Sequence, residues 1–334
     1  MKILVTGGAG FIGSNFVRYI IHTHPDWKIT NYDKLTYAGN LENLKDYEDN
    51  ASYSFVMGDI SDRRMVDSVL DSGYDVIINF AAESHVDRSI LDSSPFVETN
   101  FKGTQVLLDS AKEHGIGLYI QVSTDEVYGS REQGYFNEKS PLNPSSPYSA
   151  CKAAADLLCL AYHKTHLLPI IITRCTNNYG PYQFPEKLIP LVITNALEDK
   201  PIPVYGDGLY RRDWIYVEDH CRALETTILK GKPGEIYNIS GGQEKTNIDL
   251  IQTILQILNK PDSLIHYIKD RPAHDRRYAI DSYKISYELG WHPIYSLNDA
   301  LKSTVDWYIN NKNWWLKVKS KEYMEYYKRV YLNR

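Results

Sequence analysis

A glycine-rich turn near the N-terminus constrains the fold of this chain more than any other feature of its sequence. The segment Thr6–Gly13 reads Thr-Gly-Gly-Ala-Gly-Phe-Ile-Gly, so its glycines fit both the GxGxxG and the GxxGxxG spacing. It follows the apolar run Ile3–Thr6 and opens the amphipathic stretch Phe11–His24. Glycines there permit a tight turn and let backbone N–H groups at a helix N-terminus reach a pyrophosphate. The alternative is a turn that only packs a helix on a strand, and the strand–turn–helix context favours a dinucleotide site.

Short apolar runs alternate with longer amphipathic segments through the first half of the chain. The runs that we predict to be strands are rich in Val, Ile and aromatic residues: Ile3–Thr6, Lys28–Tyr32, Ser54–Met57, Val76–Phe80, Leu118–Val122 and Ile170–Thr173. The helices predicted in this half are Phe11–His24, Arg63–Ser72, Phe96–His114 and Tyr148–His166. Such alternation is typical of a parallel sheet with helices on both faces. We therefore expect an α/β fold with a Rossmann-like, doubly wound parallel sheet.

Beyond Thr173 the predicted elements become shorter and prolines become more frequent. Helices are predicted at Leu188–Glu198, Val217–Leu229, Asn247–Leu258 and Leu297–Asn311. We expect a smaller, less regular α/β substrate lobe, with residues 1–174 as the dinucleotide-binding domain and 175–334 mainly as this lobe. Some segments of the second range are expected to return to the main sheet, as near Ile236–Ile239.

Composition excludes several classes of partner. The net charge of -5 over 334 residues provides no basic footprint for nucleic acid. No apolar stretch approaches the length of a membrane span, and the N-terminus lacks the features of a signal peptide. The four cysteines form no CxxC pair and no metal-type spacing. We expect a cytoplasmic protein with reduced thiols, no membrane association and no metal.

Two acidic residues near the second and third strands bear on the cofactor. Asp33 lies 20 residues beyond Gly13, where a carboxylate accepts hydrogen bonds from the adenosine ribose and repels a 2′-phosphate. This favours NAD over NADP, although Lys34 acts against that preference. Asp59 follows the third strand, and binding of the adenine edge and capping of a helix are equally compatible with its type.

A tyrosine and a lysine share one face of a predicted helix. Ser145-Ser146-Pro147 is typical of a helix start, which places Tyr148 and Lys152 at positions i and i+4. A neighbouring ammonium and a cationic nicotinamide would lower the pKa of the phenol, so that Tyr148 could deprotonate a sugar hydroxyl. The alternative is an ordinary amphipathic face, and the position after the fifth strand of a dinucleotide fold favours catalysis.

The triplet Thr124-Asp125-Glu126 stands at the carboxyl end of the fifth predicted strand, the edge where ligands bind in open parallel sheets. By themselves, two adjacent carboxyls there would be read as solvated loop residues. Together with the other motifs, the chain resembles the extended short-chain dehydrogenase/reductase superfamily and, within it, the dTDP-glucose 4,6-dehydratases. The stretches that carry this resemblance are the glycine loop, Ala81–Ser89, the triplet, Tyr148 with Lys152, Asn177–Pro181, Arg212–Trp214 and Arg271–Arg276.

The resemblance implies a set of ligand-binding residues. NAD would be held by Gly7, Gly10, Phe11, Ile12, Gly13, Asp33, Lys34, Thr36, Asp59, Ile60, Ala81, Ala82, Ser84, Tyr148, Lys152 and Asn178. A nucleotide sugar would be bound by Ser84, His85, Thr124, Asn177, Lys187, Leu188, Pro203, Val204, Tyr205, Arg212, Asn247, Arg271 and His274. It also implies a homodimer, formed through the helices at Phe96–His114 and Tyr148–His166.

The resemblance further implies a mechanism. Tyr148 would deprotonate the C4 hydroxyl, Glu126 would remove the C5 proton, and protonated Asp125 would assist departure of the C6 hydroxyl as water. Thr124 would hydrogen-bond near O4, beside the oxygen whose charge changes. Epimerases of the superfamily usually carry small residues in place of Asp125 and Glu126. A nucleotide-sugar epimerase, a dehydratase for another nucleotide sugar and a catalytically silent NAD-binding protein remain the alternatives.

Overall fold

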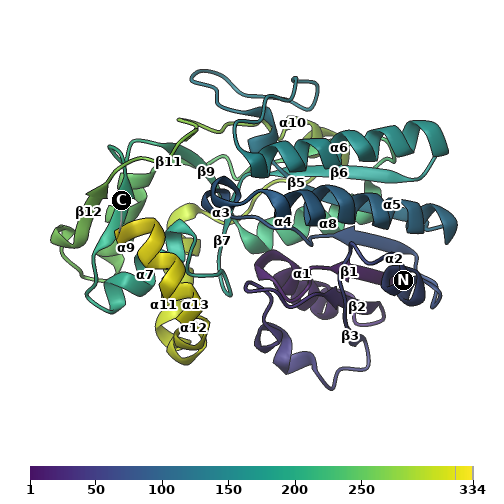
Figure 1. Cartoon of the computed structure of the whole chain (residues 1–334), viewed down its shortest axis with the longest axis horizontal. Helices are drawn as coiled ribbons and strands as arrows, with labels where there is room; N and C mark the ends of the chain where they lie inside the picture. Colours follow the sequence, from purple (N-terminus) through teal and green to yellow (C-terminus); the bar gives the residue numbers. More distant parts are fainter. Residues whose placement is uncertain (320, 333–334) are drawn as a thin grey trace.

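The computed structural model describes residues 1–319 and 321–332. Its largest unit is a sheet of seven strands in the order β10-β6-β5-β4-β1-β2-β3, and every neighbouring pair is parallel (Figure 1). The strands are β1 (Lys2–Thr6), β2 (Lys28–Asp33), β3 (Tyr53–Met57), β4 (Val76–Asn79), β5 (Leu118–Thr124), β6 (Ile170–Cys175) and β10 (Ile236–Ile239). The strand order reverses between β1 and β4, and ligands of open α/β sheets bind in the crevice at such a reversal. The expected Rossmann-like, doubly wound fold is confirmed.

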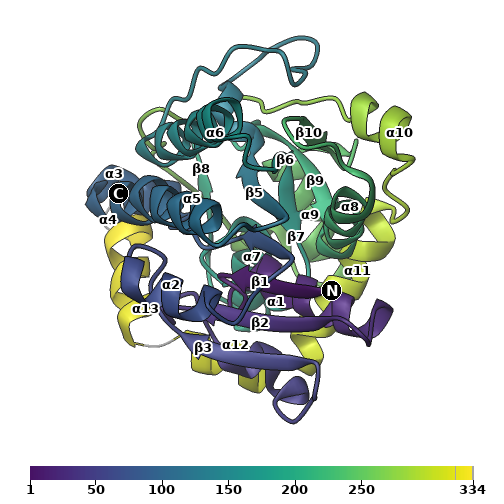
Figure 2. The ribbon, with the colours of Figure 1, turned by 90° about the vertical axis from the view of Figure 1, so that its right-hand side faces the viewer.

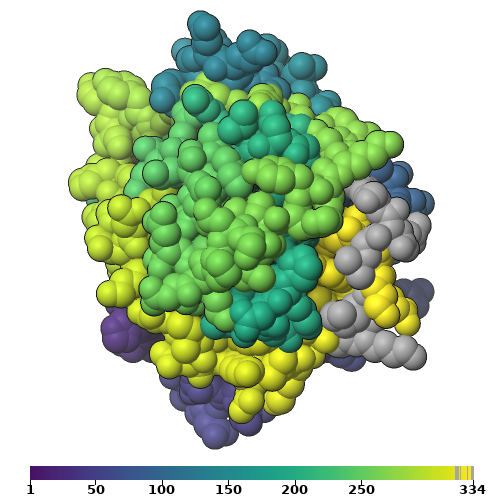
Figure 3. Space-filling model, turned by 90° about the vertical axis from the view of Figure 1, so that its left-hand side faces the viewer, coloured from purple at the N-terminus to yellow at the C-terminus, as the bar shows by residue number. Residues whose placement is uncertain are grey.

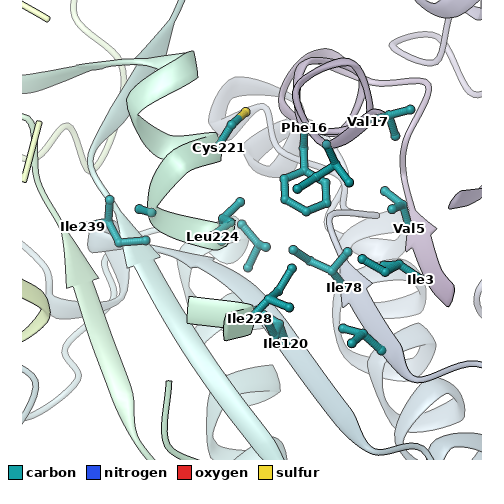
Figure 4. Close-up of a cluster of buried hydrophobic side chains, with 14 of the residues drawn as sticks. Ile3, Val5, Phe16, Val17, Ile78, Ile120, Cys221, Leu224, Ile228 and Ile239 are labelled. Carbon is teal, nitrogen blue, oxygen red and sulfur yellow. The ribbon is translucent and has the colours of Figure 1, made fainter. Parts of the chain in front are cut away.

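Helices cover both faces of this sheet (Figure 2). One face carries α1 (Phe11–Thr23) and α8 (Val217–Lys230), and the other carries α2 (Arg63–Leu70), α5 (Thr104–Glu113) and α6 (Pro147–His166). Because successive side chains of a strand point to opposite faces, Ile3 packs toward α1 and α8, whereas Leu4 packs toward α2 and α5. Figure 4 shows the first of these cores, between the strands and the two helices α1 and α8. Burial on both faces explains why central strands such as β1 and β4 are nearly continuous runs of Val, Ile and Leu.

The segment that we predicted as one helix at Phe96–His114 is divided in the structure. The short α4 (Ser94–Phe96) leads into a π-helical stretch, η2 (Val97–Gly103), and α5 follows directly. The side chain of Asn100, in this stretch, accepts from the backbone N–H of Glu83 and donates to its carbonyl, both at 2.9 Å. The irregular turn therefore fastens the loop after β4, and such π-helical turns are frequent at functional sites. Hydrophobic periodicity cannot reveal a single wide turn inside a longer helix.

The smaller lobe contains two short sheets, in the orders β11-β9-β7 and β12-β8. Their strands are β7 (Asn177–Tyr179), β8 (Ile202–Tyr205), β9 (Arg211–Tyr216), β11 (Glu244–Thr246) and β12 (Ile265–Ile268), and the lobe helices are α7 (Leu188–Leu197), α9 (Asn247–Ile257), α11 (Leu297–Asn310), α12 (Lys312–Val318) and α13 (Lys321–Tyr327). They enclose a core of their own around Ile193, Ile254 and Trp315. Figure 3 views the molecule from this side, where green segments from the middle of the chain lie beside the yellow C-terminal helices.

The chain passes between the main sheet and the lobe more than once. After β9 it returns through α8 to the main sheet, where β10 pairs with β6, and it then re-enters the lobe at β11. The division at residues 174 and 175 remains a prediction, and residues 320 and 333–334 of its second range lie outside the described residues. Across residues 1–319 and 321–332, none of the helices combines the length and the apolar character required to cross a bilayer.

Candidate active site

Two cavities open at the carboxyl edge of the main sheet and meet where this edge faces the lobe. The first runs from the glycine turn past the ends of β4 and β5, and the second lies between the loop after β4 and the lobe. Four residues line both cavities: Glu126, Asn177, Glu186 and Lys187. A ligand in one cavity can therefore approach a ligand in the other at this junction.

The residues expected from the sequence line the two cavities, and Glu126, Asn177 and Lys187 line both. All sixteen expected NAD-binding residues line the first cavity, as do the five catalytic candidates and Ser84. The second cavity is lined by His85, Asn177, Lys187, Leu188, Pro203, Val204, Tyr205, Arg212, Asn247, Arg271 and His274. The structure thus brings every expected substrate-binding residue to one of the two cavities. Which of them contact a ligand remains a proposal.

The glycine turn has the geometry of a dinucleotide site. Gly7 has φ +71°, and a Cβ there would lie 2.6 Å from the backbone nitrogen of Ala81, so only glycine fits. A Cβ on Gly13 would lie 2.3 Å from the carbonyl oxygen of Gly7, which requires glycine where α1 packs on the turn. Asp33 fixes the turn from the next strand, since its carboxyl accepts from the N–H of Ala9 at 2.9 Å and of Leu35 at 2.8 Å. These residues fit a dinucleotide whose pyrophosphate meets the N-terminus of α1.

Tyr148 and Lys152 both lie on the buried side of α6. Ser146 caps this helix in a capping box with Ser149, and Pro147 occupies the first turn, as the sequence indicated. The Lys152 ammonium donates to the Val122 carbonyl at 2.7 Å, and burial lowers its pKa. Burial, followed by the Glu126 carboxyl, raises the pKa of Tyr148 well above 10.0. The residues around the phenol exclude water and include a carboxyl, so the expected lowering would have to come from the cationic nicotinamide of a bound dinucleotide.

The Thr124 hydroxyl organises the turn that follows β5. It lies 3.3 Å from Oδ1 of Asp125 and accepts from the N–H of Glu126 at the same distance, where it caps the 3-10 helix η3 (Asp125–Tyr128). Oδ2 of Asp125 is buried and has no hydrogen-bond partner among residues 1–319 and 321–332. A buried polar atom without a partner is costly unless a ligand satisfies it.

The two adjacent carboxyls differ in their surroundings. Burial, the neighbouring Glu126 carboxyl and Asp213 raise the pKa of Asp125 well above its ordinary value. Burial also raises the pKa of Glu126, but Arg271 and Lys187 act against that rise by stabilising the anion. Asp125 is therefore the member of the pair that keeps its proton to higher pH, as an acid beside a base requires.

Cationic and aromatic side chains surround the second cavity. Arg212 Nη2 donates to the carbonyl of Asp275 at 2.9 Å, and its guanidinium lies 4.3 Å from the centre of the Tyr278 ring. Arg271 lies 3.8 Å from Asp87 and keeps a buried Nε with no partner within the part of the chain that the structure describes. His274 stacks on Tyr210, and burial together with Arg271 and Arg212 lowers its pKa to about 3. Two fixed guanidiniums beside a neutral imidazole suit a ligand that carries phosphate groups.

Sequence reasoning missed several residues of the two cavities, and two of them are central. Glu186 accepts from Tyr37 at 2.9 Å and from Arg88 at 3.2 Å, so it joins the loop after β2 to the helix α3 (Val86–Leu91). Tyr278 lies beside Glu126. Glu186 adjoins Lys187, and Tyr278 follows His274 by four residues. This proximity to predicted site residues was the feature of the sequence that could have indicated them. Among residues 1–319 and 321–332, no group of three or more His, Cys, Asp or Glu side chains could hold a metal ion.

Comparison with known proteins agrees with this geometry. The family model described as GDP-mannose 4,6 dehydratase matches residues 4–304. A dTDP-glucose 4,6-dehydratase of Streptomyces niveus is 51% identical over 324 residues, which cover 96% of this chain and 96% of that protein. The crystal structure of DesIV, a dTDP-glucose 4,6-dehydratase of Streptomyces venezuelae with NAD bound, is 49% identical, with a TM-score of 0.94 and coverage of 96% of this chain and 100% of that chain.

An epimerase structure is more distant. The UDP-glucuronic acid 4-epimerase of Bacillus cereus, in complex with UDP-glucuronic acid and NAD, is 31% identical, with a TM-score of 0.87 and coverage of 93% of this chain and 99% of that chain. The fold is thus shared with epimerases, whereas sequence identity near one half is shared with dehydratases. This chain belongs to the dTDP-glucose 4,6-dehydratase family, within the extended short-chain dehydrogenase/reductase superfamily.

Proposed function

We propose that this protein is an NAD-dependent hydro-lyase that converts dTDP-glucose into dTDP-4-dehydro-6-deoxyglucose and water, a reaction of deoxysugar biosynthesis. The observation that carries the proposal is the position of the adjacent carboxyls Asp125 and Glu126. They line the same cavity as Tyr148 and Lys152, beside the junction with the second cavity. Dehydration requires an acid and a base in addition to the tyrosine, and this chain provides both.

Tyr148 acts first, at the C4 hydroxyl of the glucose. Its phenolate removes the hydroxyl proton, and the Thr124 hydroxyl hydrogen-bonds the same oxygen as its charge changes. Bound NAD+ supplies the redox chemistry, in which a hydride leaves C4 and is later delivered to C6. Burial and the Glu126 carboxyl raise the pKa of Tyr148, so formation of the phenolate depends on positive charge brought by the bound dinucleotide and on the Lys152 ammonium.

Asp125 and Glu126 then carry out the elimination. The ketone at C4 acidifies the proton on C5, which the Glu126 carboxylate removes. Asp125, which stays protonated because of its raised pKa, donates its proton to the C6 hydroxyl as that group departs as water. Glu126 returns a proton to C5 when C6 is reduced.

The second cavity is proposed to hold the nucleotide diphosphate. Arg212 and Arg271 would bind the pyrophosphate, while Pro203, Val204 and Tyr205 of β8 would contact the base. Preference for thymine over uracil depends on one methyl group, and discrimination of a single methyl in an apolar pocket amounts to roughly 1–3 kcal/mol. Relatives named for dTDP-glucose favour thymine.

The test is a panel of dTDP-, UDP-, CDP- and GDP-hexoses, with the product analysed by mass and NMR. We expect loss of one water and a 4-keto-6-deoxy product, fastest with dTDP-glucose. A product of unchanged mass with inverted configuration would instead establish an epimerase. Absence of any product from the whole panel would leave a dinucleotide-binding protein without this activity.

We further propose that the protein is a cytoplasmic homodimer. All four cysteines are free thiols, which suits a reducing compartment. Val97 and Phe101 of η2 are 49% and 38% exposed, and Leu157 of the neighbouring α6 is 57% exposed. A second copy of the chain would cover these apolar side chains in a symmetric interface between the helices at Phe96–His114 and Tyr148–His166.

A further inference from the structure

Tyr278, which the proposed cycle does not use, lies directly beside the carboxyl of Glu126. Its hydroxyl oxygen is 3.5 Å from Oε2 of Glu126, and it donates a hydrogen bond to Oδ2 of Asp275 at 2.9 Å. The hydroxyl of Ser145 donates to the same oxygen of Asp275, and Ser145 is exposed to solvent. The four side chains thus form a line that begins at Glu126, in the cavity, and ends at the protein surface.

The middle of this line is firmly positioned. Tyr278 is only 4% exposed, and its ring packs against the guanidinium of Arg212. Arg212 in turn donates to the backbone carbonyl of Asp275, so one side chain positions both the Tyr278 ring and Asp275. Burial and the Glu126 carboxyl raise the pKa of Tyr278 well above 10.0, which keeps its hydroxyl protonated and able to donate.

Glu126 has little other access to solvent once a ligand is bound. It lines both cavities at their junction, and a nucleotide sugar bound there would cover the side that faces the cavities. Tyr278 also lines the second cavity, and its hydroxyl leads from Glu126 to Asp275. A proton held on Glu126 during the reaction would then have a path to water through the protein rather than through the substrate.

We propose that Tyr278 and Asp275 form the route by which the proton that Glu126 takes from C5 exchanges with solvent. The inference rests on the proposed dehydration, in which Glu126 is the base at C5. Once protonated, Glu126 donates to the Tyr278 oxygen while Tyr278 passes its own proton to Asp275. Two O–H bonds break and two form, so the negative charge moves from Asp275 to Glu126 and no proton is lost. Asp275 exchanges its proton with water beside Ser145, and the reverse transfer returns a solvent proton to Glu126.

The present distances agree with this sequence of transfers. At 2.9 Å the tyrosine proton belongs to the bond with Asp275, whereas 3.5 Å is long for an O–H···O bond. An ionised Glu126 is only an acceptor and cannot hydrogen-bond the lone pairs of the tyrosine oxygen. When it takes up a proton it becomes a donor, and the contact shortens.

The experiment follows hydrogen at C5 of the product when the enzyme turns over dTDP-glucose in D2O, measured by NMR at early conversion. The wild-type product is expected to carry deuterium at C5. Tyr278→Phe keeps the ring over Arg212 but removes the hydroxyl. The deuterium content at C5 of its product should therefore be several-fold lower than in wild type, with the original hydrogen retained there. Asp275→Asn, which keeps Tyr278, should do the same. Tyr295→Phe is the matched control, because its hydroxyl donates to Glu218 at 2.8 Å and it lines neither cavity.

Each outcome separates this route from the proposed function. If the wild-type chain forms no dehydrated product, the proposed function fails. If it dehydrates but Tyr278→Phe and Asp275→Asn retain wild-type deuterium at C5, the route is wrong and the function stands. The same conclusion follows if the wild-type product carries no deuterium at C5. Loss of all turnover in both variants, with unchanged melting temperature and NAD content, would place the two residues in the chemistry itself and overturn the route.

Discussion

The ammonium of Lys34 lies 2.5 Å from Oδ2 of Asp59, across the end of the first cavity. Lys34 is the one residue whose type argued against a preference for NAD, because a cation there could attract a 2′-phosphate. Its pairing with Asp59 neutralises that cation, and the neighbouring Asp33 remains the charge that a 2′-phosphate would meet. The pair therefore reconciles Lys34 with a site for NAD.

Releasing Lys34 should improve binding of NADP+. We expect Asp59→Asn to raise the affinity for NADP+ by a few-fold, since a partly exposed ion pair is worth about 0.2–1 kcal/mol. Isothermal titration with NAD+ and NADP+ measures the change. Adding Lys34→Gln in the same background should abolish the gain, and a gain that survives this second substitution would show that Lys34 is not its source.

Asp125→Asn should remove activity and at the same time stabilise the fold. As the general acid, Asp125 is expected to contribute about 10²–10⁴ in kcat. Because the pKa of Asp125 is raised in the folded state, the native state keeps a proton that the unfolded state releases at pH values between the two pKa values. The free energy of unfolding of the wild-type protein therefore falls as pH rises from the unfolded pKa through the folded one. An asparagine side chain does not titrate, so it adds no pH dependence to the free energy of unfolding. The variant should therefore become more stable than wild type as pH rises, by about 1 kcal/mol.

Urea unfolding of both proteins at a series of pH values measures this difference. Asp75→Asn, which removes an exposed carboxyl, serves as the charge-matched control. A stability difference between Asp125→Asn and wild type that stays constant with pH would contradict the raised pKa. Full activity in the variant would contradict the role of Asp125 as the acid.

Much of the fold could be predicted from the sequence because the main sheet is buried on both faces. Strands such as β1 and β6 are then continuous apolar runs, and the predicted ranges Ile3–Thr6 and Ile170–Thr173 lie within the observed ones. The short strands of the lobe, such as β7 with three residues, carry no such pattern and were missed. Their pairing depends on neighbours distant in the chain, as where β7 pairs with β9.

The candidate site shows the same division between local and distant information. Tyr148 with Lys152, and Asp125 with Glu126, each lie within a few residues of one another, so local spacing was sufficient to single them out. The contact between Tyr278 and Glu126 joins positions 152 residues apart, and only the folded chain reveals it. The direction of the Tyr148 pKa was also beyond the sequence, since it depends on how completely the phenol is buried.

Asp156→Ala should destabilise the fold strongly. Asp156, one turn beyond Lys152 on α6, accepts from Arg174 Nε at 2.8 Å, and the two residues are 0% and 1% exposed. Removing the carboxylate leaves a buried guanidinium without its counter-charge, at a cost of about 3–5 kcal/mol. Urea unfolding measures the loss. The exposed pair of Glu42 with Lys317 provides the control, because Glu42→Ala should cost less than about 1 kcal/mol, and equal effects of the two substitutions would contradict the argument.

The proposed dimer can be tested at the exposed apolar side chains of η2 and α6. Leu157→Glu places a carboxylate in the centre of the proposed interface, where an unpaired charge would have to be desolvated. We expect wild-type protein to sediment as a dimer and the variant as a monomer at the same concentration. Ile294→Glu is the matched control, since Ile294 is 59% exposed and lies outside these helices, so that variant should remain dimeric. A monomeric wild-type protein, or a Leu157→Glu variant that remains dimeric, would exclude the interface proposed here.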